Sequence, residues 1–164
     1  MRCPWTGALH ADVHRRLIAV AIDGDAGRAA RGVAHLALGD ARIVEIVCDG
    51  EGGHCRVRPR EMSARDKAIC CLAGYVCEVR ILYGPTRRLT PHEIAAHMHL
   101  PDLADAARVL GDDPAALCDA WDEAATLIDR HWPAVLAIAD RLAVTGRVDG
   151  AEAELIWRTT RRSA

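Results

Sequence analysis

The stretch from Ser63 to Gly84 constrains the fold of this chain more than any other part of the sequence. Ser63 is a good N-terminal helix cap, and Gly84 followed by Pro85 ends a helix, so that roughly twenty residues lie in one helix. Gly74 lies in the middle of the segment and allows a neighbouring helix to approach closely. Apolar side chains form a stripe at helical spacing, at Ile69, Leu72, Ala73, Val76 and Cys77. The segment therefore predicts a central, buried helix.

The residues before this helix predict two more helices and a hairpin. Apolar spacing indicates a helix over Leu9 to Ile22 and a second from about Ala26 to Leu38, which Gly39 ends. The run Arg42 to Cys48 is rich in β-branched residues, and a glycine-rich turn leads from it into a short second strand over residues 54–57. We expect one hairpin or the edge of a small sheet.

The residues after the central helix predict helices almost throughout. Thr90 to Glu93 has the spacing of a capping box with proline at the first helical position, and Pro101 and Asp113-Pro114 begin two further helices. Trp132-Pro133 kinks or divides the last long helical stretch, and residues 145–157 form a turn into a terminal helix. The fold class is therefore α+β and mainly α, in a single domain over residues 1–164.

Composition excludes several classes of protein. The chain has 164 residues, of which 51% are hydrophobic and 27% charged, as in a globular domain with one core. We expect no membrane association, since no apolar run approaches the roughly 18 residues that cross a bilayer. The N-terminus carries no secretory signal pattern, which predicts a cytoplasmic protein. A net charge of −2 with 4% aromatic residues argues against a nucleic-acid surface.

The cysteines and histidines give no strong metal motif. The seven cysteines lie mostly in apolar segments and never in C-x-x-C spacing, which predicts buried, reduced thiols. His92 and His97 would diverge by about 140° on a helix and could not share one ion. His97 and His99 lie near Asp102 in sequence, where an irregular site remains open, although a helix-end cluster with ordinary hydrogen bonds is the favoured interpretation.

His10 and His14 form the other candidate metal pair. They lie about 40° apart around a helix, a spacing that allows two imidazoles to bind one zinc. A zinc peptidase also needs a glutamate directly after the first histidine, and Ala11 stands there instead. Beside Arg15 and Arg16, the two histidines are better interpreted as solvated side chains.

The order of elements as a whole resembles the peptidase domain of FtsH-type ATP-dependent zinc metalloproteases. The likeness covers Ala26 to about Trp157, and is greatest to short, free-standing relatives without the ATPase. Leu72-Ala73-Gly74 with Glu78 and the later "LYG" match the family's L-A-G-x-x-A-E…G segment, except that Cys77 replaces alanine. Asp102-Leu103 with Ala106 matches the family's D-L-x-x-A, and the resemblance makes Asp102 the third zinc ligand.

The chain departs from this family at its catalytic motif. Counting back from "HLALG" places the family's H-E-A-G-H on residues 27–31, where Gly27 and Arg31 replace the histidines and Arg28 replaces the glutamate. Glycine has no side chain to bind a metal, and a guanidinium stays protonated and repels a dication. The resemblance therefore implies a non-hydrolytic, peptidase-like binding module without a cofactor. We expect Arg31 to form an ion pair with Asp102 in place of the metal.

A different alignment with the family's metal motif leaves open the possibility that the chain is an active enzyme. If residues 23–39 were an insertion, His10 and His14 would stand for the metal motif and join Asp102 in a zinc-dependent peptidase. This alternative still lacks the glutamate and leaves a whole helix unexplained. In both cases the expected partner is a protein or a peptide, and homo-oligomerisation stays open.

Overall fold

The structure is a computed structural model that describes residues 25–39, 41–48, 53–59, 61–84 and 90–162. It is mainly helical with a small antiparallel sheet, which confirms the α+β class expected from the sequence. The expected helix over Leu9 to Ile22, with His10 and His14, lies outside the described residues. The described elements share one hydrophobic core.

Helix boundaries follow the signals in the sequence. Helix α2 spans Asp25–Leu38 and is followed by Gly39 with a φ of +69°. Helix α3 spans Ala64–Tyr83, between the cap Ser63, whose hydroxyl accepts from the backbone N–H of Asp66, and the cap Gly84. Helix α4, Pro91–Ala96, begins with the complete capping box predicted from Thr90 and Glu93.

The remaining helices have proline or glycine at their first or second position. Helix α5 spans Pro101–Val109, and α6 spans Pro114–Arg130 with the Asp113 carboxylate as its cap. Helix α7, Trp132–Thr145, starts directly after α6, so Pro133 divides the helical stretch rather than kinking it. The terminal helix α8 spans Gly150–Arg162. Within the described residues, no helix is both long and apolar enough to cross a membrane.

The sheet has one strand more than the predicted hairpin. Strands β1, Ala41–Cys48, and β2, Gly53–Pro59, are antiparallel, with a register shift between Ile43 and Glu45. A third strand, β3, Arg147–Asp149, pairs antiparallel with the other edge of β1, which gives the order β2-β1-β3. Residues expected only to turn into the last helix thus complete the sheet.

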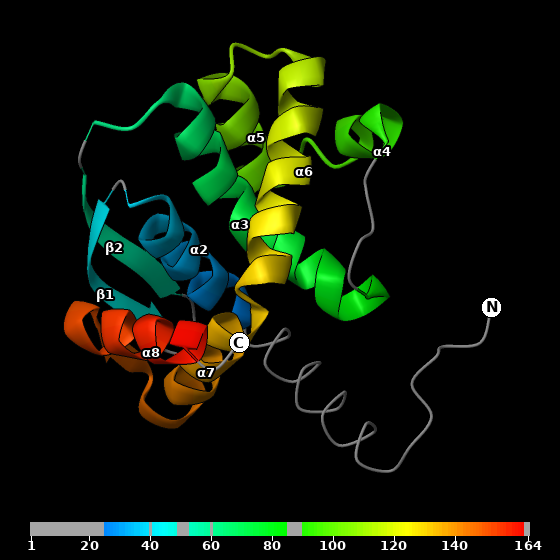
Figure 1. Cartoon of the computed structure of the whole chain (residues 1–164). Coiled ribbons are helices and arrows are strands. Elements are labelled where there is room, and N and C mark those ends of the chain that lie inside the picture. The colour runs from blue at the N-terminus through cyan, green and yellow to red at the C-terminus, as the bar shows by residue number, and fades with distance from the viewer. Residues whose placement is uncertain (1–24, 40, 49–52, 60, 85–89, 163–164) are drawn as a thin grey trace.

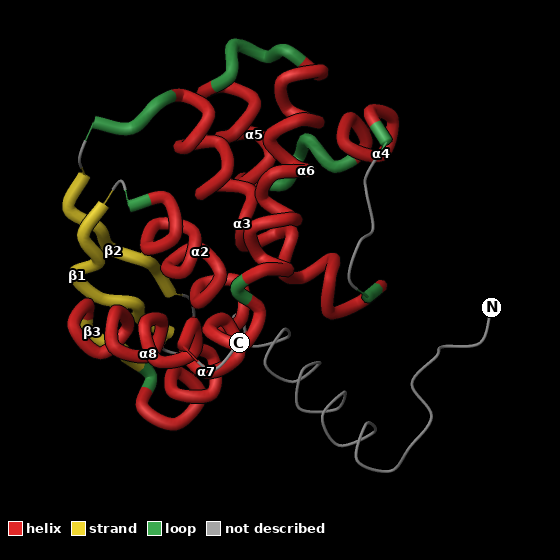
Figure 2. The backbone as a smooth tube through the Cα atoms, in the orientation of Figure 1, coloured by secondary structure: helices red, strands yellow, loops and turns green. Residues whose placement is uncertain are grey.

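Helix α3 lies at the centre of the molecule, as predicted. Figure 1 shows it between α2 on one side and α5 and α6 on the other, and the side-chain packing agrees. Most of the predicted stripe is buried, including Leu72, Ala73 and Cys77 at 0% exposure. Figure 2 shows the sheet with α2 packed on the side toward α3, and α7 and α8 at its lower end.

The six cysteines among the described residues form no disulfide bond with one another. Cys48, Cys70 and Cys77 are buried, whereas Cys55, Cys71 and Cys118 are half-buried, so the prediction of burial is confirmed for the first three only. Burial raises the pKa of the Cys77 thiol to about 12.

Candidate functional site

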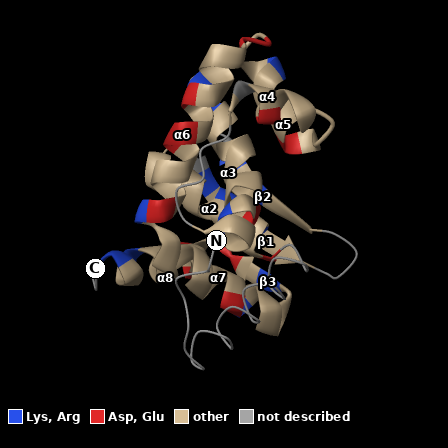
Figure 3. Ribbon diagram, turned by 90° about the vertical axis from the view of Figure 1, so that its right-hand side faces the viewer, with Lys and Arg blue, Asp and Glu red and all other residues tan. Residues whose placement is uncertain are grey.

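Three helices bring together the residues that the resemblance singled out. Helix α2 supplies Gly27, Arg28 and Arg31, α3 supplies Gly74 and Glu78, and α5 supplies Asp102. Because α3 packs against both α2 and α5, segments far apart in the sequence meet over its middle. In Figure 3, basic segments are visible where α2 and α3 lie side by side. We call these six residues the helix-crossing site.

Two glycines let α2 and α3 cross closely at this site. A Cβ atom added at Gly74 would lie 3.4 Å from the carbonyl oxygen of Gly27 and 3.1 Å from Nε of Arg31. The same atom would lie 3.2 Å from Oδ2 of Asp102. These distances are at or inside close van der Waals contact, so glycine at position 74 makes room for the arginine and the aspartate to meet above the backbone of α3.

Arg31 and Asp102 form an ion pair across the site. Nη2 of Arg31 donates a hydrogen bond to Oδ1 of Asp102, and the two side chains are 38% and 26% exposed. Burial disfavours the charged guanidinium, but the hydrogen bond and the charge of Asp102 outweigh burial and leave the pKa of Arg31 above its usual value. The predicted contact is therefore confirmed.

Arg28 points away from Asp102 toward the hairpin. Its Nη1 donates to Sγ of Cys48 at 3.5 Å. A Cβ atom at Gly53 would lie only 2.0 Å from Nε of Arg28, so the absence of a side chain at Gly53 creates the space that the guanidinium occupies. One signal for this contact is present in the sequence, the glycine-rich turn that leads into β2.

Glu78 completes the charges of the site. A Cβ atom added at Gly27 would lie 3.4 Å from Oε1 of Glu78. Burial, followed by repulsion from Asp102, raises the pKa of Glu78, while the charges of Arg31 and Arg28 oppose this rise. The site thus holds two guanidinium groups and two carboxyl groups, and their charges cancel when all four are ionised.

The thiols that flank Arg31 are poor nucleophiles. Burial raises the pKa of Cys55 to about 11, although the charge of Arg31 lowers it. Burial likewise raises the pKa of Cys71, against the same opposing charge. Both groups stay protonated at neutral pH, and thiols react as thiolates. Sequence analysis missed these neighbours of Arg31, because nothing in the sequence indicates that a residue of β2 and a residue of α3 both lie near it.

The other sequence candidates do not join this site. Nδ1 of His97 donates to the carbonyl oxygen of Glu93 at 2.6 Å, and its ring lies 6.2 Å from that of His99 and 6.1 Å from that of Tyr75. These are the ordinary helix-end contacts favoured for His97. In the part of the chain that the structure describes, no group of three or more histidine, cysteine, aspartate or glutamate side chains is arranged to hold a metal ion.

Comparison with known proteins does not extend the resemblance found in the sequence. No protein-family model matches the chain, and a search of curated proteins finds no significant match.

Proposed function

We propose that this chain is a catalytically degenerate domain of the FtsH-type zinc metallopeptidase kind, which acts as a non-hydrolytic binding module. The observation that carries the proposal is the ion pair between Arg31 and Asp102. The resemblance assigns these two positions to metal ligands. Here a permanent cation on one ligand position neutralises the carboxylate on the other.

The chemistry of the helix-crossing site agrees with the loss of hydrolysis. Metal-assisted peptide hydrolysis needs an ion that lowers the pKa of a bound water, and a base that takes the proton of that water. Arg28 occupies the position of the base and binds the thiol of Cys48 instead. A guanidinium accepts no proton near neutral pH, so neither Arg28 nor Arg31 can replace the lost groups.

A binding role is compatible with what remains. The proposed partner is a protein or peptide, because the related domains act on polypeptides, and the proposed location is the cytoplasm. The helix-crossing site offers two guanidinium groups and two carboxyl groups over the close crossing of α2 and α3. A pull-down from the native host with the whole chain would identify such a partner.

No described contact favours the alternative zinc peptidase with His10, His14 and Asp102. In that mechanism the carboxylate of Asp102 would have to leave Arg31 to bind the metal. The partial burial of the pair makes this separation costly, since it leaves both charges without a partner. The alternative therefore serves as the outcome that would overturn our proposal.

Metal content and cleavage activity separate the two functions. The protein is purified without added zinc, its metal content is measured by mass spectrometry, and casein and peptide cleavage are assayed with and without a chelator. We expect substoichiometric zinc and no chelator-sensitive cleavage. Stoichiometric zinc together with cleavage that disappears in the variant His10→Ala/His14→Ala would contradict the proposal. The variant Asp102→Ala applies the same test to the third ligand of the alternative zinc site.

A further inference from the structure

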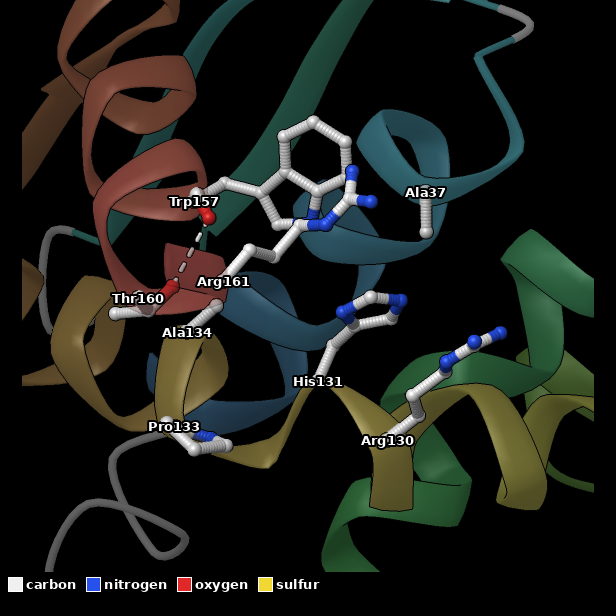
Figure 4. A pocket seen from close by; sticks show the side chains of 8 residues that line it. All are labelled: Ala37, Arg130, His131, Pro133, Ala134, Trp157, Thr160 and Arg161. Atoms are coloured by element: carbon white, nitrogen blue, oxygen red, sulfur yellow. Dashed lines mark hydrogen bonds between the residues drawn. The ribbon is translucent and has the colours of Figure 1, made fainter. Parts of the chain in front are cut away.

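A cationic pocket lies away from the helix-crossing site, where the ends of α2, α6, α7 and α8 meet. Its volume is about 380 Å³, and its lining includes Arg130 at the end of α6 and His131 before α7. Trp157, Thr160 and Arg161 line it from the last turns of α8. In Figure 4 the imidazole of His131 lies between the guanidinium groups of Arg130 and Arg161. This volume is within the usual range for small-molecule sites.

Positive charge in this pocket is not balanced by nearby acids. Among the described residues, neither Arg130 nor Arg161 forms an ion pair with an acidic side chain, whereas Arg158 of the same helix α8 pairs with Glu154. Burial lowers the pKa of His131, and the charges of Arg161 and Arg130 lower it further. Both arginines therefore lie near enough to affect the imidazole, and all three side chains line the pocket.

Arg161 is already held in place for binding. Its guanidinium carbon lies 4.6 Å from the centre of the Trp157 ring, and stacking of this kind leaves the N–H groups at the edge of the guanidinium free to donate. His131 lies on the same aromatic ring, at 6.1 Å between centroids. The buried indole N–H of Trp157 has no acceptor among the described residues. Donors therefore outnumber acceptors in this lining.

Partial charges at the helix ends change the electrostatic potential of the pocket without reversing its sign. The N-terminus of α7 contributes a partial positive charge of about one half, and the C-termini of α2, α6 and α8 each contribute a similar negative charge. The hydroxyl of Thr160 is directed to the backbone, donating to the carbonyl oxygens of Ile156 and Trp157, both at 3.0 Å. The two full charges on Arg130 and Arg161 thus decide the sign of the potential.

We propose that this pocket binds the phosphate group of a small phosphorylated compound. Two guanidinium groups and an imidazole line a space that admits such a group with a small organic part, and arginine matches the geometry of phosphate oxygens. The bound anion relieves the repulsion on His131 and favours its protonated form. For a given ionisation state of the phosphate group, affinity consequently rises as the pH falls through the pKa of His131.

Inorganic phosphate is the probe, and NMR of the histidine side chains in the full chain is the measurement. The signal of His131 is assigned with the variant His131→Gln. We expect phosphate to raise the pKa of His131 by about one unit in a saturable titration, relative to chloride at equal ionic strength. Acetate should produce a much smaller rise. The phosphate assignment is overturned if the pKa of His131 rises no more in phosphate than in chloride, or if acetate raises it equally.

Arginine variants test whether the pocket itself is responsible. Arg161→Gln and Arg130→Gln should each weaken phosphate binding about tenfold or more. Arg158→Gln makes the same chemical change on helix α8 outside the pocket and should bind as the wild type does. Arg130 forms no described ion pair, so its variant should keep the fold even if loss of the Arg161 stack disturbs α8. Unchanged affinity in Arg130→Gln, or equal loss in Arg158→Gln, contradicts the proposal.

Discussion

Arg31 can neutralise Asp102 in a way that few side chains at its position could. A guanidinium stays charged when it is partly buried, and it directs several N–H donors toward a carboxylate in one plane. The pair lies above Gly74, where no side chain intrudes. An arginine at one of the two positions that the resemblance assigns to metal ligands, with the aspartate kept at the other, thus gives a structural contact.

Removal of Arg31 should expose the dependence of Asp102 on it. We predict that Arg31→Ala lowers the free energy of unfolding by about 1 kcal/mol, the upper end for partly solvated pairs. The double variant with Asp102→Asn should recover part of this loss, because the carboxylate no longer lacks a partner. Urea unfolding of the two single variants and the double variant gives the coupling energy. Strict additivity of the two effects would argue against a direct interaction.

Glu78 should lower the stability of the fold as the pH rises. Its pKa is raised in the folded state, chiefly by burial and then by Asp102, so the folded state holds this proton more tightly than the unfolded state does. Any stability from Glu78 is therefore present below its unfolded pKa and is lost as the pH rises through the folded pKa. We predict that Glu78→Gln unfolds at a higher urea concentration than wild type at pH 7, and that the difference disappears toward acidic pH. A difference that grows on acidification would refute the assignment.

Sequence reasoning at the residue scale found the ion pair but not the surroundings of Arg28. The pair followed from the resemblance together with the charge of a guanidinium. Arg28 and Arg31 lie about 60° apart around α2, so only one of them faces α5, and the sequence does not say which way the helix is turned. The thiol of Cys48 and the space at Gly53, which determine where Arg28 lies, belong to a hairpin whose position depends on the whole fold.

At the scale of elements, the close crossing of α2 and α3 is the feature on which the site depends. Gly27 and Gly74 face each other there, and a Cβ atom at Gly27 would lie 3.7 Å from the Cα atom of Gly74. Such proximity brings the backbones near enough for short polar contacts between side chains of α2 and α5. Any large side chain at position 74 would separate these helices.

Gly74→Leu should destabilise the fold by a few kcal/mol, because the new side chain overpacks the crossing. The Cβ atom alone would already press on Arg31 and Asp102. Ala125→Ser on α6, which is half-buried and outside the crossing, serves as the control and should change stability little. The measurement is thermal unfolding followed by circular dichroism. A melting temperature equal to that of wild type would show that position 74 is not at a close crossing.

Gly150 offers a second test, at the junction of β3 and α8. A Cβ atom there would lie 1.9 Å from the carbonyl oxygen of Ile43 in β1, so the backbone must move to accommodate it. We predict that Gly150→Ala lowers the free energy of unfolding by more than about 1 kcal/mol. Ala151→Gly at the next, exposed position should cost less, as expected near a helix end. Equal stability of both variants would place the start of α8 farther from the sheet.

The elements differed in how well local sequence predicted them. Helices with caps, such as α3 and α4, were predicted within a residue or two because the cap residues and the prolines act locally. Strand β3 was missed because it has only three residues and takes its hydrogen bonds from Ile46 and its neighbours, about a hundred positions earlier in the chain. Pairing over such a distance depends on the packing of α7 and α8, which no local pattern encodes.

At the scale of the whole molecule, α3 holds α2 and α5 so that Arg31 and Asp102 meet. The central claim is that this scaffold is built like a zinc peptidase and that substitutions on α2 removed the metal site. A scaffold of this kind should accept a metal again once the ligands are restored. At the first of these positions, a Cβ atom added at Gly27 would make only ordinary contacts, the nearest at 3.4 Å from Oε1 of Glu78.

Zinc binding by the triple variant Gly27→His/Arg28→Glu/Arg31→His is the most direct test of this claim. The two histidines would stand at the chelating spacing opposite Asp102, and we predict that the folded variant binds stoichiometric zinc while the wild type does not. Adding Asp102→Ala to the triple variant should abolish or greatly weaken this binding. A triple variant that is folded by circular dichroism and takes up no zinc, or one that binds zinc equally well without Asp102, would contradict the account.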